Sequence, residues 1–175
     1  MTSATSDMRA EASVLDRLAI EDTLHRHCRG LDRCDAELLT SCYWPEAEVD
    51  YGSYKGRAHD FAGLVVSALG DSYELTRHRI SNILISFKGV TARVESYVCA
   101  VHLLPGGEQE MRFEGRYLDT LEKRDERWAM CYRQVVMDWS DTSSVTDGRY
   151  SEAFSALARG HNDKRDPVYP HLSGE

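Results

Sequence analysis

The chain has 175 residues, of which 42% are hydrophobic and 29% are charged, as is ordinary for a soluble globular protein. Its formal net charge of -8 argues against a nucleic-acid-binding protein, because such a protein needs a basic surface patch. No apolar run is long enough to cross a bilayer, and the opening residues MTSATSDMRAEAS do not resemble a secretory signal. We therefore expect one cytoplasmic domain, large enough to bury a core and a pocket.

Cysteine content and common motifs give no sign of a disulfide framework, a metal or a nucleotide. The five cysteines are odd in number and include no C-x-x-C pair, which predicts reduced and mostly buried thiols. The chain contains no G-x-G-x-x-G, P-loop or H-E-x-x-H motif. We expect that neither a cofactor nor a metal ion takes part in the chemistry.

The first predicted element is a helix over residues 10–29, after a short disordered lead-in over residues 1–9. One face of this helix is apolar except for His27, whose burial needs a polar partner from elsewhere in the chain. Gly30 can end or bend the helix. The predicted stripe consists of Ile20, Leu24, His27, Cys28 and Leu31.

A second, short helix is expected from Asp35, whose side chain can cap it. Trp44-Pro45 should end this helix. A short strand over 47–52 and a third helix over roughly 58–69 complete the first half of the chain.

From Tyr73 onward the hydrophobic period changes to two, which indicates four long strands joined by short turns. Helices followed by a long meander predict an α+β fold, with the N-terminal helices packed on a curved, mainly antiparallel sheet. Such a sheet forms a cone-shaped α+β barrel whose mouth can hold a small molecule. We place this domain at residues 10–140. The strands are predicted at about 74–87, 90–104, 110–123 and 127–139.

The C-terminal extension, residues 141–175, differs in character from the domain. Its first part, SDTSSVTDGR, is predicted to be a linker, and YSEAFSALARG could form a short helix. The rest is polar and irregular. The extension either closes the pocket, clasps a neighbouring subunit or is only loosely attached.

Five polar side chains are out of place in this apolar pattern. His78, His102 and Arg133 lie on the apolar faces of three predicted strands. His27 lies on the helix stripe, and Asp32 follows the helix directly. A domain of this size rarely buries five such groups unless they line one cavity, so we expect them to converge.

Each of these residues also has a purely structural explanation. A lone histidine on an apolar face is often a satisfied core residue, Arg133 could form an ion pair, and Asp32 could cap the following helix. A metal site is an alternative for His78, His102 and Asp32, although no short ligand spacing supports it.

The chain resembles the SnoaL-like branch of the nuclear transport factor 2-like superfamily over residues 10–140. The resemblance rests on four segments, HCRGLDRCDAELL, CYWPEAEVDYG, TRHRISN and RWAMCYRQVVMDW. Scytalone dehydratase, hexachlorocyclohexane dehydrochlorinase and the bile-acid dehydratases belong to this branch. The resemblance implies an enzyme that eliminates water or a halide without a cofactor.

The resemblance also implies roles for the five polar residues. Asp32 and His78 match the catalytic dyad of the branch, and Arg133 matches an arginine of the final strand. His102 matches a second pocket histidine. His27 departs from the pattern, because several relatives have tyrosine or lysine there. A histidine is a workable general base near neutral pH, so we assign His78 as the base and Asp32 as its orienting partner, with His27, His102 or Arg133 stabilising negative charge.

Aromatic side chains are expected to line the pocket, which suits a cyclic or aromatic substrate. We therefore predict a cofactor-independent lyase of the dehydratase type. A retro-aldol lyase that releases formaldehyde from a lignin-type diaryl compound, an isomerase or cyclase, and a non-catalytic binding or assembly module are alternatives. Relatives imply a homo-oligomer, either a trimer or a dimer. The predicted substrate-binding residues are Tyr51, Tyr54, Trp44, Tyr117 and Trp139.

Overall fold

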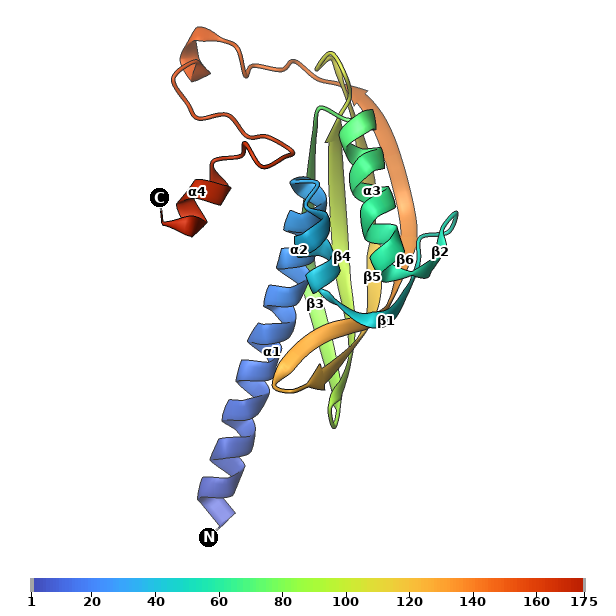
Figure 1. The fold of residues 1–175 in the computed structure, drawn as a ribbon, viewed down its shortest axis with the longest axis vertical. Coiled ribbons are helices and arrows are strands. Elements are labelled where there is room, and N and C mark those ends of the chain that lie inside the picture. Colours follow the sequence, from blue (N-terminus) through green and yellow to red (C-terminus); the bar gives the residue numbers. More distant parts are fainter. Residues whose placement is uncertain (1, 175) are drawn as a thin grey trace.

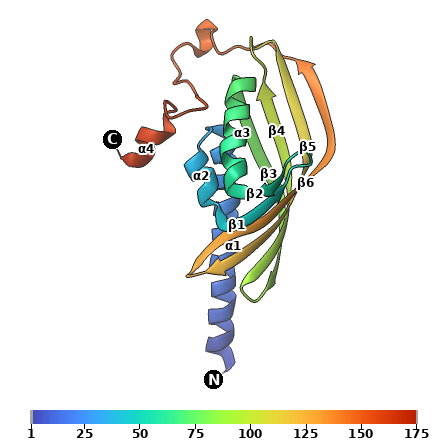
Figure 2. The same cartoon turned by 45° about the vertical axis from the view of Figure 1, so that its right-hand side comes forward.

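The computed structural model describes the backbone of residues 2–174 and the side chains of residues 14–174. It shows an α+β fold in which helices cover one face of a curved sheet of six strands, as predicted (Figures 1 and 2). The elements are α1 (Thr2–Asp32), α2 (Ala36–Ser41), β1 (Tyr43–Asp50), β2 (Lys55–Arg57), α3 (Ala58–Ser72), β3 (Leu75–Lys88), β4 (Thr91–Leu103), β5 (Gln109–Arg124), β6 (Arg127–Ser144), a 3₁₀ turn (Glu152–Phe154) and α4 (Val168–Ser173).

The sheet has the strand order β2-β1-β6-β5-β4-β3. Consecutive hairpins join β3 to β6, as predicted, and only the pairing of β1 with β6 is parallel among the described strands. One strand was missed, and the bounds predicted for another were wrong. The short strand β2 was not predicted, and β1 begins at Tyr43, so that it includes Pro45. The missing N–H of Pro45 breaks no pairing, because the register between β1 and β6 is interrupted between Tyr43 and Glu48.

Helix α1 presents its predicted apolar stripe to the sheet, and all five stripe residues are buried. The helix does not end at Gly30 but continues to Asp32. A Cβ atom at Gly30 would lie only 3.0 Å from the backbone nitrogen of Leu39, so glycine allows α2 to pack closely against α1. The disordered lead-in was predicted over residues 1–9. Residue 1 lies outside the described residues, and the side chains of the others are not described, so the lead-in stays a prediction. Of the described helices, none has the length and hydrophobicity that a membrane span requires.

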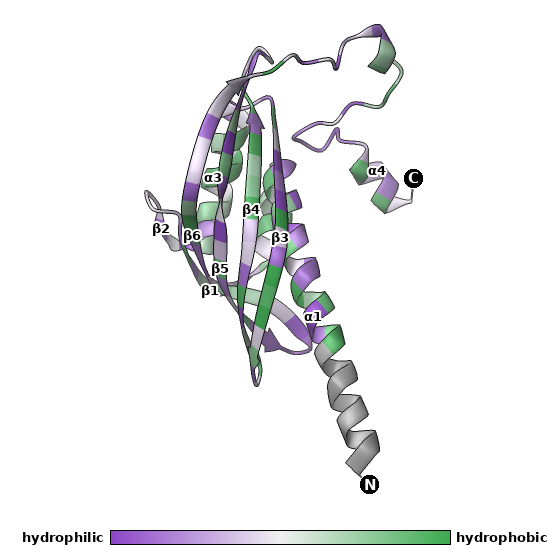
Figure 3. Cartoon of the chain, turned by 180° about the vertical axis from the view of Figure 1, so that it is seen from behind, coloured by the Kyte–Doolittle hydropathy of each residue, from purple (hydrophilic) through white to green (hydrophobic). Residues whose placement is uncertain are grey.

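Three β-bulges, one in β3 and two in β6, change which side chains face the helices. One of those in β6 inserts Cys131 between Met130, which pairs with Leu121, and Tyr132, which pairs with Thr120. In β3 the register shifts between Ser81 and Leu84, where Asn82 has a φ of 48°, and Leu84 therefore points outward instead of sharing the face of His78. In β6, Met137 pairs with Gly115 and Trp139 pairs with Glu114, so the residue between them is an insertion. The outer side of the sheet carries both hydrophobic and hydrophilic bands (Figure 3).

The carboxylate of Asp35 and an ion pair between Arg33 and Asp166 attach the C-terminal extension to the helical layer. Asp35 caps α2 by accepting a hydrogen bond from the Leu38 backbone N–H at 3.1 Å, as predicted. The same side chain accepts hydrogen bonds from Lys164 at 2.6 Å and from the Tyr169 hydroxyl at 2.8 Å. The helix expected over residues 150–160 is limited to the 3₁₀ turn, and β6 extends to Ser144, into the predicted linker.

Gly115 is required by the bulge in β6. A Cβ atom built on it would lie 2.2 Å from the Val136 carbonyl oxygen and 2.8 Å from the Phe113 ring. Any larger residue must therefore displace backbone atoms of the central sheet. By contrast, Gly63 lies exposed in α3, and a Cβ atom added there would have no atom of its surroundings within 4 Å.

We expect Gly115→Ala to lower the free energy of unfolding by about 2 kcal/mol or more, because overpacking in a rigid core is costly. Gly63→Ala is the matched control and should raise the free energy of unfolding by roughly 0.5–1 kcal/mol, because alanine favours a helix interior. Urea denaturation followed by circular dichroism measures both. Equal stabilities for Gly115→Ala and the wild type would contradict the proposed need for glycine.

Candidate active site

The end of α1 and the edge strand β3 bring Asp32 and His78 together. Oδ1 of Asp32 accepts a hydrogen bond from Nδ1 of the His78 ring at 2.7 Å. The same carboxylate accepts the backbone N–H of His78, at 2.9 Å to Oδ1 and 3.1 Å to Oδ2. Because a carboxylate only accepts, the proton of the imidazole is on Nδ1, and the lone pair of Nε2 points away from Asp32. Asp32 does not cap α2, which was the structural alternative.

The dyad is largely enclosed but not sealed. Asp32 is 9% exposed, and the His78 side chain is 8% exposed. Both contribute to a groove of about 460 Å³ between α1 and β3. This groove has a strongly polar rim, unlike the mostly apolar lining that the sequence predicts for the pocket as a whole. Its lining residues are His25, Cys28, Arg29, Asp32, Arg33, His78, Arg79 and Ile80.

An apolar surface starts beside His78 on the inner face of the sheet. His78 pairs with Ala100, which pairs with Phe113 on the next strand. The following row joins Val98 to Gly115 and Met137. Met137 is 60% exposed, so solvent reaches the end of this surface.

His102 lies next to the dyad on the inner face of β4. Its Nδ1 atom is 2.7 Å from the hydroxyl oxygen of Thr76, and its ring stacks on Tyr73 with 4.4 Å between centroids. The ring of His78 meets it edge-on at 5.6 Å. Burial, together with the nearby His78, lowers the pKa of His102 to about 4. His102 is therefore neutral at pH 7 and can donate or accept a hydrogen bond, but it is a poor base.

Arg133 forms a fully buried ion pair with Asp119. The guanidinium donates from Nε to Oδ1 and from Nη2 to Oδ2, both at 2.7 Å. Its central carbon also lies 3.9 Å from the centroid of the Tyr117 ring. Burial opposes the charge of Arg133, but Asp119 outweighs this effect, and the pKa of Arg133 is raised. Arg133 thus forms the ion pair that was its purely structural explanation, and this ion pair lies at the centre of the site.

His27 connects this ion pair to a buried tyrosine. Nη1 of Arg133 lies 2.8 Å from Nδ1 of His27, and Nε2 of His27 lies 2.9 Å from the Tyr43 hydroxyl. Burial, and to a smaller degree the charges of Arg133 and His78, lower the pKa of His27 well below its ordinary value. A neutral, enclosed histidine of this kind cannot act as a proton donor to a leaving group at neutral pH.

The five predicted substrate-binding residues are not all near the dyad. Tyr117 contacts Arg133, and the Tyr51 hydroxyl lies beside Arg133 and Tyr43. Trp44 stacks against two arginines at the far end of β6, and its indole N–H donates to a backbone carbonyl. Tyr54 donates to a backbone carbonyl in the β2 region.

Trp139 was predicted to face the pocket, and this prediction was wrong. The bulge in β6 turns it to the outer face of the sheet, where it pairs with Glu114 and lies beneath the Arg112 guanidinium.

Two residues of the site were not predicted. Asp119 lies two positions after Tyr117 and so shares its inward face, which a period-two reading of β5 would have shown. Tyr43 is the first residue of β1, where no sequence pattern marks its hydroxyl as functional.

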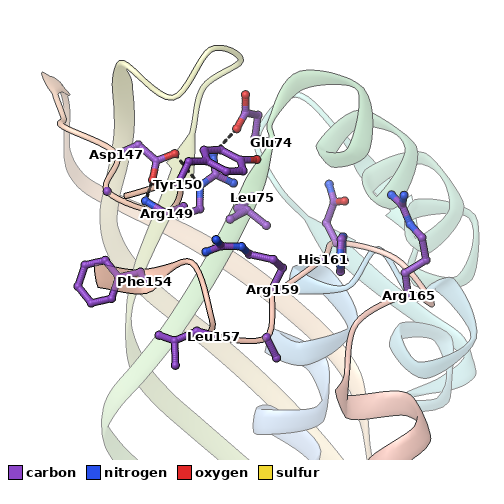
Figure 4. A pocket seen from close by; sticks show the side chains of 14 residues that line it. Glu74, Leu75, Asp147, Arg149, Tyr150, Phe154, Leu157, Arg159, His161 and Arg165 are labelled. Atoms are coloured by element: carbon purple, nitrogen blue, oxygen red, sulfur yellow. Dashed lines mark hydrogen bonds and ion pairs between the residues drawn. The ribbon is translucent and has the colours of Figure 1, made fainter. Parts of the chain in front are cut away.

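A further cavity lies under the C-terminal extension. It has a volume of about 560 Å³ and is lined by Glu74, Arg149, Arg159 and neighbouring residues of the extension (Figure 4). None of the predicted site residues lines it. Among residues 14–174, no group of three His, Cys, Asp or Glu side chains is arranged to hold a metal ion.

Breaking the buried ion pair should cost more stability than replacing it. We expect Arg133→Met to lower the free energy of unfolding by roughly 3–5 kcal/mol, because it leaves the Asp119 carboxylate buried without a partner. The double variant Arg133→Met/Asp119→Leu should recover most of this loss. Denaturant titration of both variants tests the expectation, and a double variant no more stable than the single one would contradict it.

The low pKa of His102 predicts acid sensitivity. Its ordinary value of 6.5 applies in the unfolded chain, so unfolding takes up a proton below that pH and stability falls between pH 6.5 and about 4. At pH 4.5 this residue should account for a loss of about 2–3 kcal/mol relative to pH 7. His102→Gln should remove that part of the pH dependence, whereas His171→Gln, at an exposed position, should not. Unfolding free energies measured from pH 4.5 to pH 7 show whether the two variants differ.

The chain is similar in structure to several solved proteins. A candidate scytalone dehydratase from Novosphingobium aromaticivorans superimposes with a TM-score of 0.70 and 24% identity, over 78% of this chain and 93% of that one. A type 2 hexachlorocyclohexane dehydrochlorinase (LinA) gives a TM-score of 0.64 and 24% identity, over 77% and 91%. A type 3 LinA from Novosphingobium barchaimii gives 0.67 and 20%, over 77% and 92%.

Sequence comparison identifies the family directly. Residues 12–134, well over half of the chain, match the SnoaL-like domain. No curated protein matches the chain in sequence. The chain therefore belongs to the SnoaL-like family, within the nuclear transport factor 2-like superfamily.

Proposed function

We propose that the protein is a cofactor-independent lyase in which His78 removes a proton from carbon and a small group leaves the neighbouring atom. The observation that carries this proposal is the 2.7 Å hydrogen bond between the His78 ring and Asp32. In general-base catalysis by histidine, a carboxylate can hold one ring nitrogen so that the other is oriented to accept a proton. Structural neighbours named as dehydratase and dehydrochlorinase support the choice of an elimination.

The dyad supplies a base whose orientation is fixed in advance. Asp32 holds the Nδ1–H of His78, which leaves Nε2 to accept a proton, and no group of residues 14–174 donates a hydrogen bond to Nε2. The backbone hydrogen bond from His78 to Asp32 prevents the carboxylate from turning away. After proton uptake, the carboxylate stabilises the imidazolium.

In the proposed step, Nε2 of His78 takes a proton from a substrate carbon. The C–H electron pair becomes the second bond of a new double bond, and the leaving group departs with its own bonding pair. When hydroxide leaves, the proton on His78 converts it to water, so the dyad returns to its starting state. This sequence needs no electron acceptor.

Negative charge that develops on the substrate needs donors other than His27. His102 is neutral and hydrogen-bonded to Thr76, so it can orient a polar group near the base. The Tyr51 hydroxyl is buried and has no hydrogen-bond partner within residues 14–174, so it can donate to a substrate oxygen. Burial raises the pKa of Tyr51, which keeps this hydroxyl protonated.

The substrate class follows from the apolar inner surface. Ala100 pairs with His78 and Phe113 pairs with Ala100, and neither side chain offers a charge to a bound molecule. A small cyclic or aromatic compound fits such a surface. Assembly into a dimer or trimer stays a prediction.

His78→Ala should reduce elimination by roughly 100- to 10,000-fold, because it removes the base. Asp32→Asn should cause a loss of similar order, because an amide can turn the imidazole to the wrong tautomer. The assay screens cyclic and aromatic alcohols for loss of water, chlorinated rings for chloride release and diaryl lignin fragments for formaldehyde, with products identified by mass spectrometry.

His171→Gln is the matched control, because this histidine is exposed in α4, and it should keep full activity. Turnover that survives in His78→Ala would refute the assignment of the base. If formaldehyde were the only product, the role of the dyad would stand, but the reaction would be carbon–carbon cleavage instead of dehydration. Binding of the screened compounds without any product would favour a non-catalytic module.

A further inference from the structure

Arginine side chains gather in a cavity between the outer side of strands β3 to β5 and the start of the C-terminal extension. The cavity has a volume of about 540 Å³, and we call it the arginine pocket. Two carboxylates, of Glu110 and Asp147, also line it, so its lining carries an excess of positive charge in a protein whose formal net charge is -8. The five arginines are Arg33, Arg77, Arg79, Arg112 and Arg149.

Two of the five arginines are neutralised by carboxylates of the protein. Arg33 forms an ion pair with Asp166 at 3.2 Å. Arg149 donates a hydrogen bond to Asp147 at 2.6 Å and also pairs with Glu74 beside the adjoining cavity (Figure 4). Both arginines thus attach the extension to the domain, and the charge that is free to bind a ligand comes from the other three.

Two of these three arginines lie on the edge strand β3. Within residues 14–174, Arg77 makes no side-chain hydrogen bond or ion pair, and Arg79 donates only to the Cys99 sulfur at 3.7 Å. Both arginines are exposed, and they share one face of the strand while His78 points to the other. Two positive charges so close together repel each other, and a bound anion would remove this repulsion.

The third arginine, Arg112, is oriented but incompletely hydrogen-bonded. Its guanidinium carbon lies 4.8 Å from the centroid of the Trp139 ring. Its Nη2 atom lies 4.0 Å from the Asp141 carboxylate, which is too far for a hydrogen bond. Its Nε–H is shielded from water and has no hydrogen-bond partner among residues 14–174. An unpaired buried donor is costly, so an acceptor from outside the chain would stabilise Arg112.

The register of the sheet brings these three side chains to one place. Arg77 and Arg112 both pair with Val101, one from β3 and the other from β5. Neighbouring strands lie about 4.8 Å apart, so the two arginine backbones are roughly 10 Å apart, and both side chains can reach a group that lies over Val101. Arg79 is two positions further along the same face of β3. The three guanidinium groups can therefore converge on one small anion.

Three guanidinium groups match a phosphate better than a carboxylate. Each can offer two parallel N–H donors, and a carboxylate has only two oxygen atoms to accept them. A phosphate monoester has three terminal oxygens and a charge of about -1.5 to -2 near neutral pH. The phosphate therefore accepts more of the available hydrogen bonds and neutralises more of the charge.

The surroundings of the three arginines also offer apolar surface. Leu75, Val101 and Leu103 line the arginine pocket. Leu75 also lines the adjoining cavity under the extension, where Tyr150 and Phe154 are exposed. An apolar group that is attached to the phosphate can bury its surface there.

We propose that the arginine pocket binds a phosphate monoester, with the phosphate held by Arg77, Arg79 and Arg112 and the ester group directed toward the cavity under the extension. Arg33 and Arg79 also line the groove beside the dyad, so the two sites are neighbours around the edge of β3. The proposal does not rest on the proposed elimination, because binding of the ester requires no chemistry at His78.

Isothermal titration calorimetry with phenyl phosphate tests the site, near neutral pH and at low ionic strength, where charges are least screened. We expect one molecule to bind per chain. Arg77→Gln and Arg112→Gln should each weaken binding about 10-fold, the effect of losing a hydrogen bond to a charged group. Arg93→Gln is the matched control, because Arg93 is exposed on the same outer face near the other end of β4, and it should bind like the wild type.

Inorganic phosphate is the second probe and separates the two parts of the ligand. Phenyl phosphate should bind roughly 3- to 10-fold more tightly, because its ring buries apolar surface. Equal affinities would refute the place assigned to the ester group. Failure of both probes to bind the wild type, or an equal loss in Arg93→Gln, would overturn the site.

Sedimentation velocity tests the competing occupant, which is a carboxylate of a second copy of the chain. We expect the wild type and Arg77→Gln to sediment alike, with or without phenyl phosphate. A wild-type oligomer that dissociates in Arg77→Gln, without any binding of phenyl phosphate, would assign these arginines to a subunit interface and overturn the proposal. Arg77 has no hydrogen bond or ion pair within residues 14–174 to lose, so the variant should fold.

Discussion

The carboxylate of Asp32 joins the helical layer to the sheet. It accepts the backbone N–H of His78, which fixes the position of β3 relative to α1. It also accepts the ring N–H, which fixes the orientation of the imidazole. β3 is an edge strand, and one of its outward N–H groups is thereby satisfied instead of being left for another chain. The same three hydrogen bonds that make the fold specific also prepare the base. A substitution at Asp32 therefore affects architecture and chemistry at once.

The polar interior consists of two units with different tasks. The dyad lies at the edge of the sheet, in contact with a groove. Deep inside, a second hydrogen-bonded set is closed to water and consists of Asp119, Arg133, His27 and Tyr43. Within this set each charged group and each ring nitrogen has a partner. In the dyad, by contrast, Nε2 of His78 has no hydrogen-bond partner among residues 14–174. This division explains why one domain can bury so many titratable groups without losing stability.

Periodicity was sufficient to predict much of the architecture. The stripe of α1, the hairpins of β3 to β6 and the inward faces of His78, His102 and Arg133 are all consequences of a regular repeat. The failures occur where the repeat is interrupted. One inserted residue in β6 turned Trp139 outward, and another in β3 turned Leu84 outward. Bulges leave no clear trace in a single sequence, because either neighbour of the insertion reads as a plausible strand residue. No periodic pattern predicts that Asp32 contacts His78, and only the family resemblance indicated that the two form a pair.

The site is assembled from both ends of the domain. Asp32 and His78 are 46 residues apart, and His27 and Arg133 are 106 residues apart. Contacts between residues so far apart in sequence slow folding, because long loops must close before they form. While a ribosome is still making β6, His27 lacks its guanidinium and the inner face of the sheet is uncovered on one side. The last strand thus completes both the core and the buried contact between Arg133 and His27, and a chain that ends before it would expose an apolar surface prone to aggregation.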